Sequence, residues 1–157
     1  LINDTAPALA ISIHQNSYHE EAINGGQVFY YKTSEKGKRL ADILQKRFDF
    51  VLGENNRRQA KPNDTYYLLL HVKSPIVIVE CGFLSNWDEA ARLNSADYQD
   101  RLAWTLHMGI LRYLNTRNCS VPSQLRAKIH SKSASPMGFL PSSLCFITVS
   151  AASAQTY

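Results

Sequence analysis

The sequence of 157 residues contains few cysteines, and their spacing suits neither crosslinks nor a metal site. Three are present, two of them at Cys119 and Cys145, and no Cys-x-x-Cys pair occurs. An odd number without that spacing argues against a disulfide framework and a cysteine zinc site. Cys81 is expected to be a small buried residue rather than a nucleophile, because the sequence places no histidine beside it.

Long hydrophobic runs are also lacking, so no transmembrane segment is predicted. The residues from Leu1 onward lack the basic start and apolar core of a signal peptide. Hydrophobic residues at 45% and charged residues at 19% are typical of one folded globular domain.

Acidic residues are absent from residues 116–157. Residues 1–115 contain 13 acidic and 13 basic residues, so the formal net charge of +4 arises entirely from that last segment. A nucleic-acid-binding surface within the domain is therefore not predicted. The last segment is also rich in serine, contains three prolines and has no sustained periodicity. We interpret residues 116–157 as a poorly ordered or foreign tail, with a small appended module as the alternative.

Apolar segments that alternate with amphipathic segments predict an α/β fold. Strands are predicted over residues 8–13, 25–31 and 76–80, of which the first and last are continuous apolar runs. Helices are predicted over residues 34–53, 86–93 and 97–115, with Ser34 and Asn86 as N-caps. Asn86, with Glu89 three residues later, resembles a capping box. Residues 54–64 are expected to form a polar loop, and residues 65–72 are too few to assign. We expect a layered, mostly parallel sheet with helices on both faces.

Two ionisable residues occupy similar positions in this pattern. His14 follows the apolar run 8–13 and Glu80 ends the run 76–80, so both are expected at the carboxyl ends of buried strands, where open α/β sheets bind ligands. A neutral imidazole can bind a metal, and a carboxylate in a dry position can act as a general base. The residues alone leave two interpretations open: metal-assisted hydrolysis, or a scaffold histidine and a structural ion pair.

Two motifs occur in a recognisable order, "ISIHQNS" at residues 11–17 and "IVIVECGFLSN" at residues 76–86, with "GGQVFYY" between them. Together they resemble the signature of zinc-dependent N-acetylmuramoyl-L-alanine amidases of the amidase-3 type. The resemblance covers about residues 1–115, which we therefore interpret as the C-terminal part of an amidase-3 catalytic domain. Within this family, the sequence most resembles the germination-specific, spore-cortex branch.

The resemblance implies an enzyme that hydrolyses the amide between N-acetylmuramic acid and the L-alanine of the peptidoglycan stem peptide. Glu80 matches the catalytic glutamate, His14 matches a zinc ligand, and Asn16 with the loop after it would line the substrate groove. Peptidoglycan is the implied partner, the cell envelope or the outside of a bacterial cell the implied location, and a monomer the expected state.

The family binds zinc through two histidines and a glutamate, and His14 is the only one of these that matches in this sequence. The other two ligands, part of the sheet and any export signal are expected upstream of Leu1. We therefore expect a truncated chain that binds zinc weakly and is inactive. His19, Glu20 and Glu21 are expected in an exposed loop rather than as substitute ligands.

Other interpretations are a non-catalytic, peptidoglycan-binding pseudoenzyme fragment and an α/β interaction domain. Arg57, Arg58 and Lys61 are able to contact acidic wall polymer or peptide carboxylates, but a solvated basic loop is the simpler expectation for them.

Overall fold

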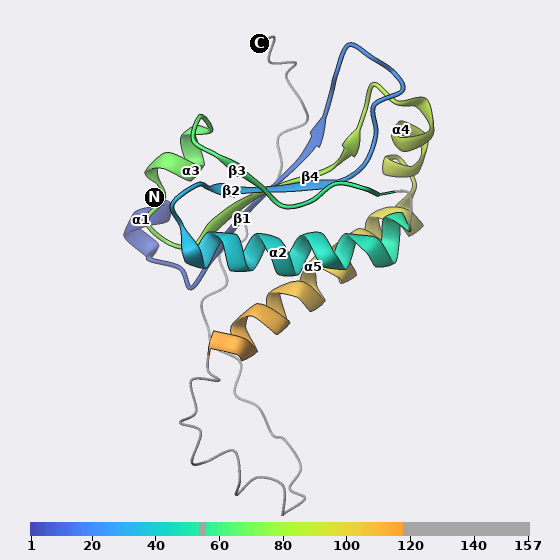
Figure 1. Cartoon of the computed structure of the whole chain (residues 1–157). Coiled ribbons are helices and arrows are strands. Elements are labelled where there is room, and N and C mark those ends of the chain that lie inside the picture. Colours follow the sequence, from blue (N-terminus) through green and yellow to red (C-terminus); the bar gives the residue numbers. More distant parts are fainter. Residues whose placement is uncertain (54–55, 118–157) are drawn as a thin grey trace, which may run out of the picture.

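The computed structural model describes residues 1–53 and 56–117, in which four strands form one sheet (Figure 1). The strands are β1 (Ala10–Asn16), β2 (Gln27–Tyr31), β3 (Lys61–Asn63) and β4 (Ile76–Phe83). They lie in the order β1-β4-β2-β3, so β1 is at an edge. Strand β1 pairs with β4, and β2 with β3, in parallel, whereas β2 and β4 are antiparallel. The mostly parallel α/β fold is thus confirmed.

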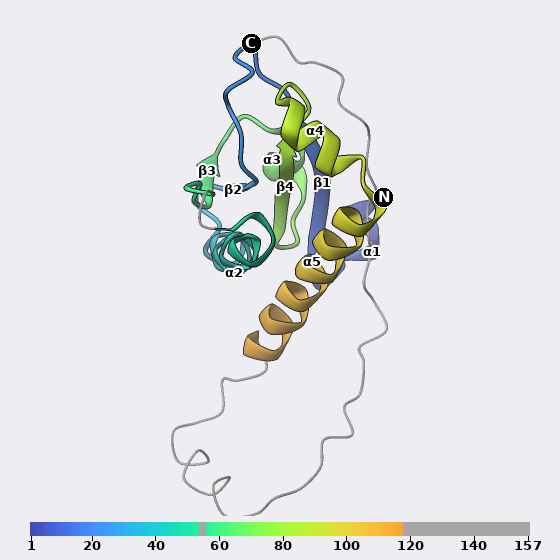
Figure 2. The ribbon, with the colours of Figure 1, turned by 90° about the vertical axis from the view of Figure 1, so that its right-hand side faces the viewer.

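Helices cover both faces of this sheet (Figure 2). The two long helices, α2 (Glu35–Leu52) and α5 (Ala96–Arg117), pack on one face against the larger core. The short helices α1 (Ile2–Thr5) and α3 (Tyr67–His71) lie on the other face, and α4 (Trp87–Leu93) follows β4 directly. Alternation along each strand divides the residues between the two faces.

The amphipathic patterns explain why the long helices form where they do. The Ser34 hydroxyl caps α2 by accepting a hydrogen bond from the Gly37 N–H at 3.0 Å. One face of each long helix is buried, through Leu40, Leu44 and Phe48 on α2 and Leu102, Leu106 and Ile110 on α5. Burial of each such side chain contributes about 1.5–3 kcal/mol. Both helices were predicted from the sequence, to within two residues at each end.

The strands that carry the candidate site residues are longer than predicted. Strand β1 continues through His14 to Asn16, and β4 continues through Glu80 to Phe83, so both residues lie within strands rather than at their ends. The reason is backbone pairing, which polar side chains do not prevent. The Leu84 N–H still donates to the Asn16 carbonyl at 2.8 Å.

Three short elements were not predicted, namely α1, α3 and β3. Strand β3 contains Pro62 and pairs only with β2 among the described strands, as a proline-containing edge strand must. Helix α5 runs two residues past the predicted domain boundary, to Arg117. The remainder of the predicted tail lies outside the described residues. Within residues 1–53 and 56–117, no helix is long and apolar enough to cross a bilayer.

Candidate active site

His14 and Glu80 are direct neighbours across the parallel pair β1 and β4. The register pairs their Cα positions, and strands paired in this way lie about 4.8 Å apart. His14 lies an even number of residues after Ala10 on β1, and Glu80 lies an even number of residues after Ile78 on β4. Ala10 and Ile78 belong to the smaller hydrophobic core, on the face of the sheet that carries α1 and α3. The two side chains therefore share the face of the sheet opposite to α2 and α5. The sequence predicts both residues at the same edge of the sheet, and in the structure they are direct neighbours.

The imidazole of His14 is held by Ser12, two residues earlier on the same face. The Ser12 Oγ and the His14 Nε2 are 2.6 Å apart, and Ser12 is only 5% exposed. Partial burial of His14 lowers the pKa of its ring, which favours the neutral form at pH 7. With Nε2 occupied by the hydroxyl, Nδ1 is the ring nitrogen left for a metal or a substrate proton.

The carboxyl group of Glu80 is poorly solvated. Glu80 is 9% exposed, and burial raises its pKa to about 7. Its Oε2 atom is buried and has no hydrogen-bond partner among the described residues. A buried acceptor without a partner is costly unless a ligand, ion or water satisfies it. The position is therefore suited to receive a proton near neutral pH.

An irregularity in β1 and β4 extends this face beyond the histidine. After the pair His14 and Glu80, the register shifts so that Asn16 pairs with Phe83. Gly82, at φ 153°, lies in the shifted segment of β4, where an L side chain would be strained. Because Asn16 is two residues after His14, the shift brings Phe83 to the same face as Glu80. The Asn16 Oδ1 accepts from the Ser17 N–H at 2.8 Å, and its proposed contact with substrate stays a prediction.

A second buried carboxylate, that of Glu89 on α4, joins the loop before β2 to the end of β4. Glu89 is 3% exposed, and both its oxygens lie 3.0 Å from the Gly25 N–H donor. The Phe83 N–H donates to the Glu89 Oε2 at 2.8 Å. This carboxylate therefore fixes the loop before β2 to β4, the strand that carries Glu80.

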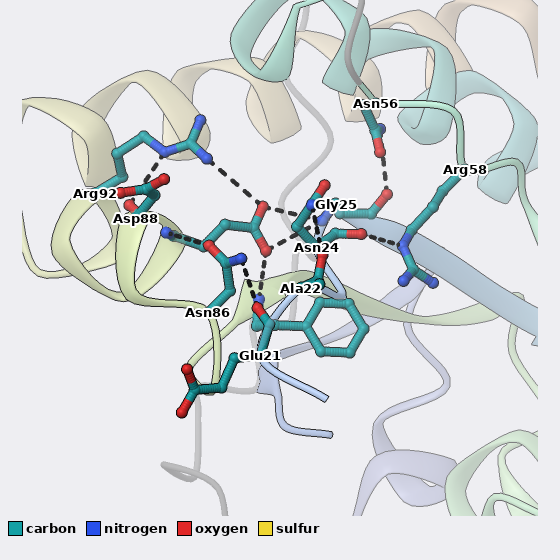
Figure 3. A network of polar contacts seen from close by, with 12 residues as sticks. Glu21, Ala22, Asn24, Gly25, Asn56, Arg58, Asn86, Asp88 and Arg92 are labelled. Carbon is teal, nitrogen blue, oxygen red and sulfur yellow. Dashed lines mark hydrogen bonds and ion pairs between the residues drawn. The ribbon is translucent and has the colours of Figure 1, made fainter. Parts of the chain in front are cut away.

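The cap of α4 is only half of the predicted capping box. The Asn86 Oδ1 accepts from the Glu89 N–H at 3.0 Å, as predicted. The Glu89 carboxylate accepts hydrogen bonds from the Gly25 and Phe83 N–H groups rather than from the Asn86 N–H. The Asn86 N–H instead donates to the Phe83 carbonyl at 3.2 Å. Figure 3 shows Asn24 and Gly25 between Arg58 on one side and Asn86 with Arg92 on the other.

Arg58 is not part of the fully solvated basic loop that the sequence predicted, because its side chain is half-buried and hydrogen-bonded. Arg57 and Lys61 are exposed, but Arg58 is half-buried, and its Nε–H donates to the Asn24 carbonyl at 2.7 Å. Its Nη1 donates to the Gln27 Oε1 at 3.1 Å, and Gln27 pairs with Glu80 across β2 and β4. The sequence identified Arg58 as a basic residue of this loop, but it did not predict the position of Arg58 beside Gln27, because that position depends on the register of β2 with β4.

The donors near His14 fit a zinc ion only in part. Imidazole and carboxylate groups are suitable zinc ligands, and a catalytic zinc is held by three of them. Within residues 1–53 and 56–117, no three His, Cys, Asp or Glu side chains gather in a way that would hold a metal. The other histidines in these ranges, His19, His71 and His107, are exposed.

The fold and these residues define an α/β protein with a histidine and a poorly solvated carboxylate on one sheet face, a site suited to hydrolysis. The sequence profile of the N-acetylmuramoyl-L-alanine amidases matches residues 1–112. The chain therefore belongs to the N-acetylmuramoyl-L-alanine amidase family, as the two sequence motifs predicted.

Two curated relatives are amidases of Bacillus subtilis. The chain is 38% identical to its germination-specific N-acetylmuramoyl-L-alanine amidase over 117 residues, which are 74% of this chain and 49% of the relative. It is 32% identical to the amidase LytC over 117 residues, which are 71% of this chain and 23% of the relative. The chain thus spans about half, or less, of the length of these relatives.

Solved structures agree with the fold. The CwlD amidase of Clostridioides difficile, solved in complex with the GerS lipoprotein, superposes with a TM-score of 0.71 at 36% identity, over 73% of this chain and 58% of that chain. The catalytic domain of the amidase CwlV from Bacillus (Paenibacillus) polymyxa gives a TM-score of 0.62 at 30% identity, over 69% of this chain and 58% of that one.

Proposed function

We propose that the protein is a peptidoglycan hydrolase that cleaves the amide between N-acetylmuramic acid and the L-alanine of the stem peptide. Family membership supports the reaction class. The observation that carries the proposal is the register pair of His14 and Glu80, which sets a possible metal ligand beside a poorly solvated carboxylate. We place this activity at the bacterial cell envelope or outside the cell, where the substrate lies.

Glu80 is proposed as the general base. In its ionised form it would take a proton from the attacking water and pass it to the leaving amine of L-alanine. Burial alone raises the pKa of this group to about 7, and a zinc ion bound beside it would lower that pKa and favour the ionised form that accepts the water proton. The buried, unpartnered Oε2 is the atom that would accept the water proton.

His14 is proposed as one ligand of a zinc ion, held in position by the Ser12 hydroxyl. A neutral ring, favoured by the lowered pKa of His14, is the form that binds a metal. Zinc bound there would polarise the scissile carbonyl and stabilise the developing negative charge. The described residues supply no complete set of ligands, so we expect the chain of residues 1–157 to bind zinc weakly.

The test is zinc content and stem-peptide release measured on the same protein. We expect less than stoichiometric zinc by metal analysis and negligible release of stem peptides from purified wall by residues 1–157. When further ligands are supplied in a longer chain, His14→Ala should remove the metal, whereas Glu80→Gln should leave it bound and abolish release. Stoichiometric zinc on residues 1–157, with release that depends on Glu80, would show that this chain holds a complete set of ligands.

A second candidate is a peptidoglycan-binding protein without turnover. The incomplete donor set among residues 1–53 and 56–117 favours it. It predicts that the chain sediments with purified wall while no stem peptide is released even when zinc is saturating. Release of stem peptides by a chain whose Glu80 is intact would exclude this candidate.

A further inference from the structure

Arg58 lies on the same face of the sheet as Glu80, one side chain away. Gln27 connects the two, since it pairs with Glu80 across β2 and β4 and accepts from the Arg58 Nη1. Phe83 gives a second connection. The register shift places its ring on this face, and the Arg58 guanidinium carbon is 4.7 Å from the ring centroid.

The guanidinium is fixed in place by the contacts around it. Its Nε–H donates to the Asn24 carbonyl, and its central carbon lies over the aromatic ring of Phe83. Gly25 leaves the space that this needs, because a Cβ there would lie 3.1 Å from the Arg58 Cδ. An arginine that is already ordered loses little further rotamer entropy when it binds a ligand.

No carboxylate neutralises this cation within the described ranges. The ion pairs found in residues 1–53 and 56–117 do not include Arg58. Glu89 acts on it only at longer range, and the oxygens of Glu89 are already bonded to Gly25 and Phe83. The Arg58 Nη2 has no hydrogen-bond partner among these residues. A half-buried cation without a counter-charge gains most from an anionic ligand.

We propose that Arg58 is a specificity-determining residue that binds a free carboxylate of the stem peptide next to the scissile amide. This inference rests on the proposed function and names the substrate class of that site: acidic, non-amidated stem peptides. The fork of guanidinium donors matches a carboxylate and does not match a neutral carboxamide.

The test is a binding measurement that needs no turnover. N-acetyl-L-alanyl-D-glutamic acid and the same dipeptide with both carboxylates amidated are titrated into the ¹⁵N-labelled chain of residues 1–157. We expect the acid to bind about tenfold more tightly, which is what a charge-assisted hydrogen bond contributes. Arg58→Gln should remove that preference, and Arg58→Lys should keep only part of it.

Arg57→Gln is the matched control, because it removes the same charge from the exposed neighbouring residue. It should keep the preference for the acid. Thermal unfolding of each variant checks that the fold is intact, and the comparison of the two dipeptides on the unmodified protein needs no variant. Equal affinity for acid and amide, no binding of either dipeptide, or a preference that survives in Arg58→Gln would overturn the inference.

These outcomes are separate from a failure of the proposed function. Stem-peptide release that depends on Glu80, combined with equal affinity for the two dipeptides, would overturn only the role of Arg58. Tight binding of the acid by a zinc-saturated longer chain that releases no stem peptide would instead contradict the hydrolytic function and leave Arg58 as a binding residue.

Discussion

The carboxyl group of Glu80 links the charge state of the site to the stability of the fold. Its pKa is raised from an ordinary 4.5 to about 7 in the folded protein, so the folded state holds its proton more tightly than the unfolded state. Stability from this group is fully present below about pH 4.5 and is lost as the pH rises towards 7. The cause is burial, since ionisation places a charge where little solvent reaches it.

We therefore expect Glu80→Gln to stabilise the protein at alkaline pH. Glutamine keeps the shape of the protonated acid and cannot ionise, so the free energy of unfolding of the variant should exceed that of the unmodified protein by about 2 kcal/mol more at pH 8 than at pH 5. Urea denaturation at the two pH values measures this difference. Glu21→Gln, at an exposed loop residue, should give no such change. A pH-independent effect of Glu80→Gln would contradict the raised pKa.

The sequence predicted His14 and Glu80 as candidate residues, but it did not predict which residues support them. Alternation along β1 makes Ser12 a predictable neighbour of His14, because residues two apart share a face. Gln27 and Arg58 were not predictable, since a contact between residues 31 apart depends on the pairing of β2 with β4. The family resemblance, rather than any pattern of residues, assigned the roles of ligand and base.

Helix α4 is short, and its main contribution is the position in which it holds Glu89. The contact between Glu89 and Gly25 spans 64 residues of sequence and closes the loop between β1 and β2 against the end of β4. The sequence pattern predicts Glu89 as part of the local helix cap, because a capping box is a short-range pattern, whereas the partners of Glu89 in the structure belong to other elements.

Glu89→Ala should therefore destabilise the protein strongly. It leaves the buried N–H groups of Gly25 and Phe83 without an acceptor, each at a cost of about 1–3 kcal/mol. The free energy of unfolding should fall by about 3 kcal/mol or more. Asp88→Ala, at the exposed neighbouring residue of the same helix turn, should cost less than about 1 kcal/mol. Equal effects of the two changes would show that the buried contacts of Glu89 contribute little.

The loop before β2 depends on a glycine at position 25. Gly25 has φ 101°, and a Cβ there would lie 2.7 Å from the Asn56 Oδ1. Gly25→Ala should thus cost the strain of the backbone, about 1–3 kcal/mol, together with displacement of the side chains around it. Gly53 is the matched control, because it also has positive φ, at 72°, while no atom of the described residues lies within 4 Å of the position that a Cβ would take there.

Thermal unfolding of both alanine variants separates strain from crowding. The midpoint should fall further for Gly25→Ala than for Gly53→Ala, and only the former should weaken the preference for the acidic dipeptide, because Arg58 lies against this position. Equal midpoints would indicate that the neighbouring side chains move aside at no cost.

The described core is continuous from β1 to the last turn of α5. Tyr113 is 1% exposed, and the Arg39 Nη2 ties α2 to the Thr116 carbonyl at 3.0 Å. We predict that the residues of this chain that unfold cooperatively end at about residue 117. A chain that ends at residue 117 should then unfold in urea within about 0.5 kcal/mol of the chain that ends at residue 157.

A chain that ends at residue 111 should lose several kcal/mol, because removal of Tyr113 opens the larger core. It is the control for the previous comparison, since both chains lack residues 118–157. If ending the chain at residue 117 lowers the free energy of unfolding as much as ending it at residue 111, the boundary of the cooperative unit lies further along the chain.

The position of β1 at the edge of the described sheet has a consequence for what can pair with it. Among the described strands β1 pairs only with β4, so its outer row of N–H and C=O groups is a template for a further extended segment, whether a strand from upstream of Leu1 or a bound peptide. A segment added there would run about 5 Å from the backbone of His14, on the side away from Glu80. A ligand at this edge would thus be recognised through its main chain, whereas Arg58 on the face of the sheet would recognise its charge.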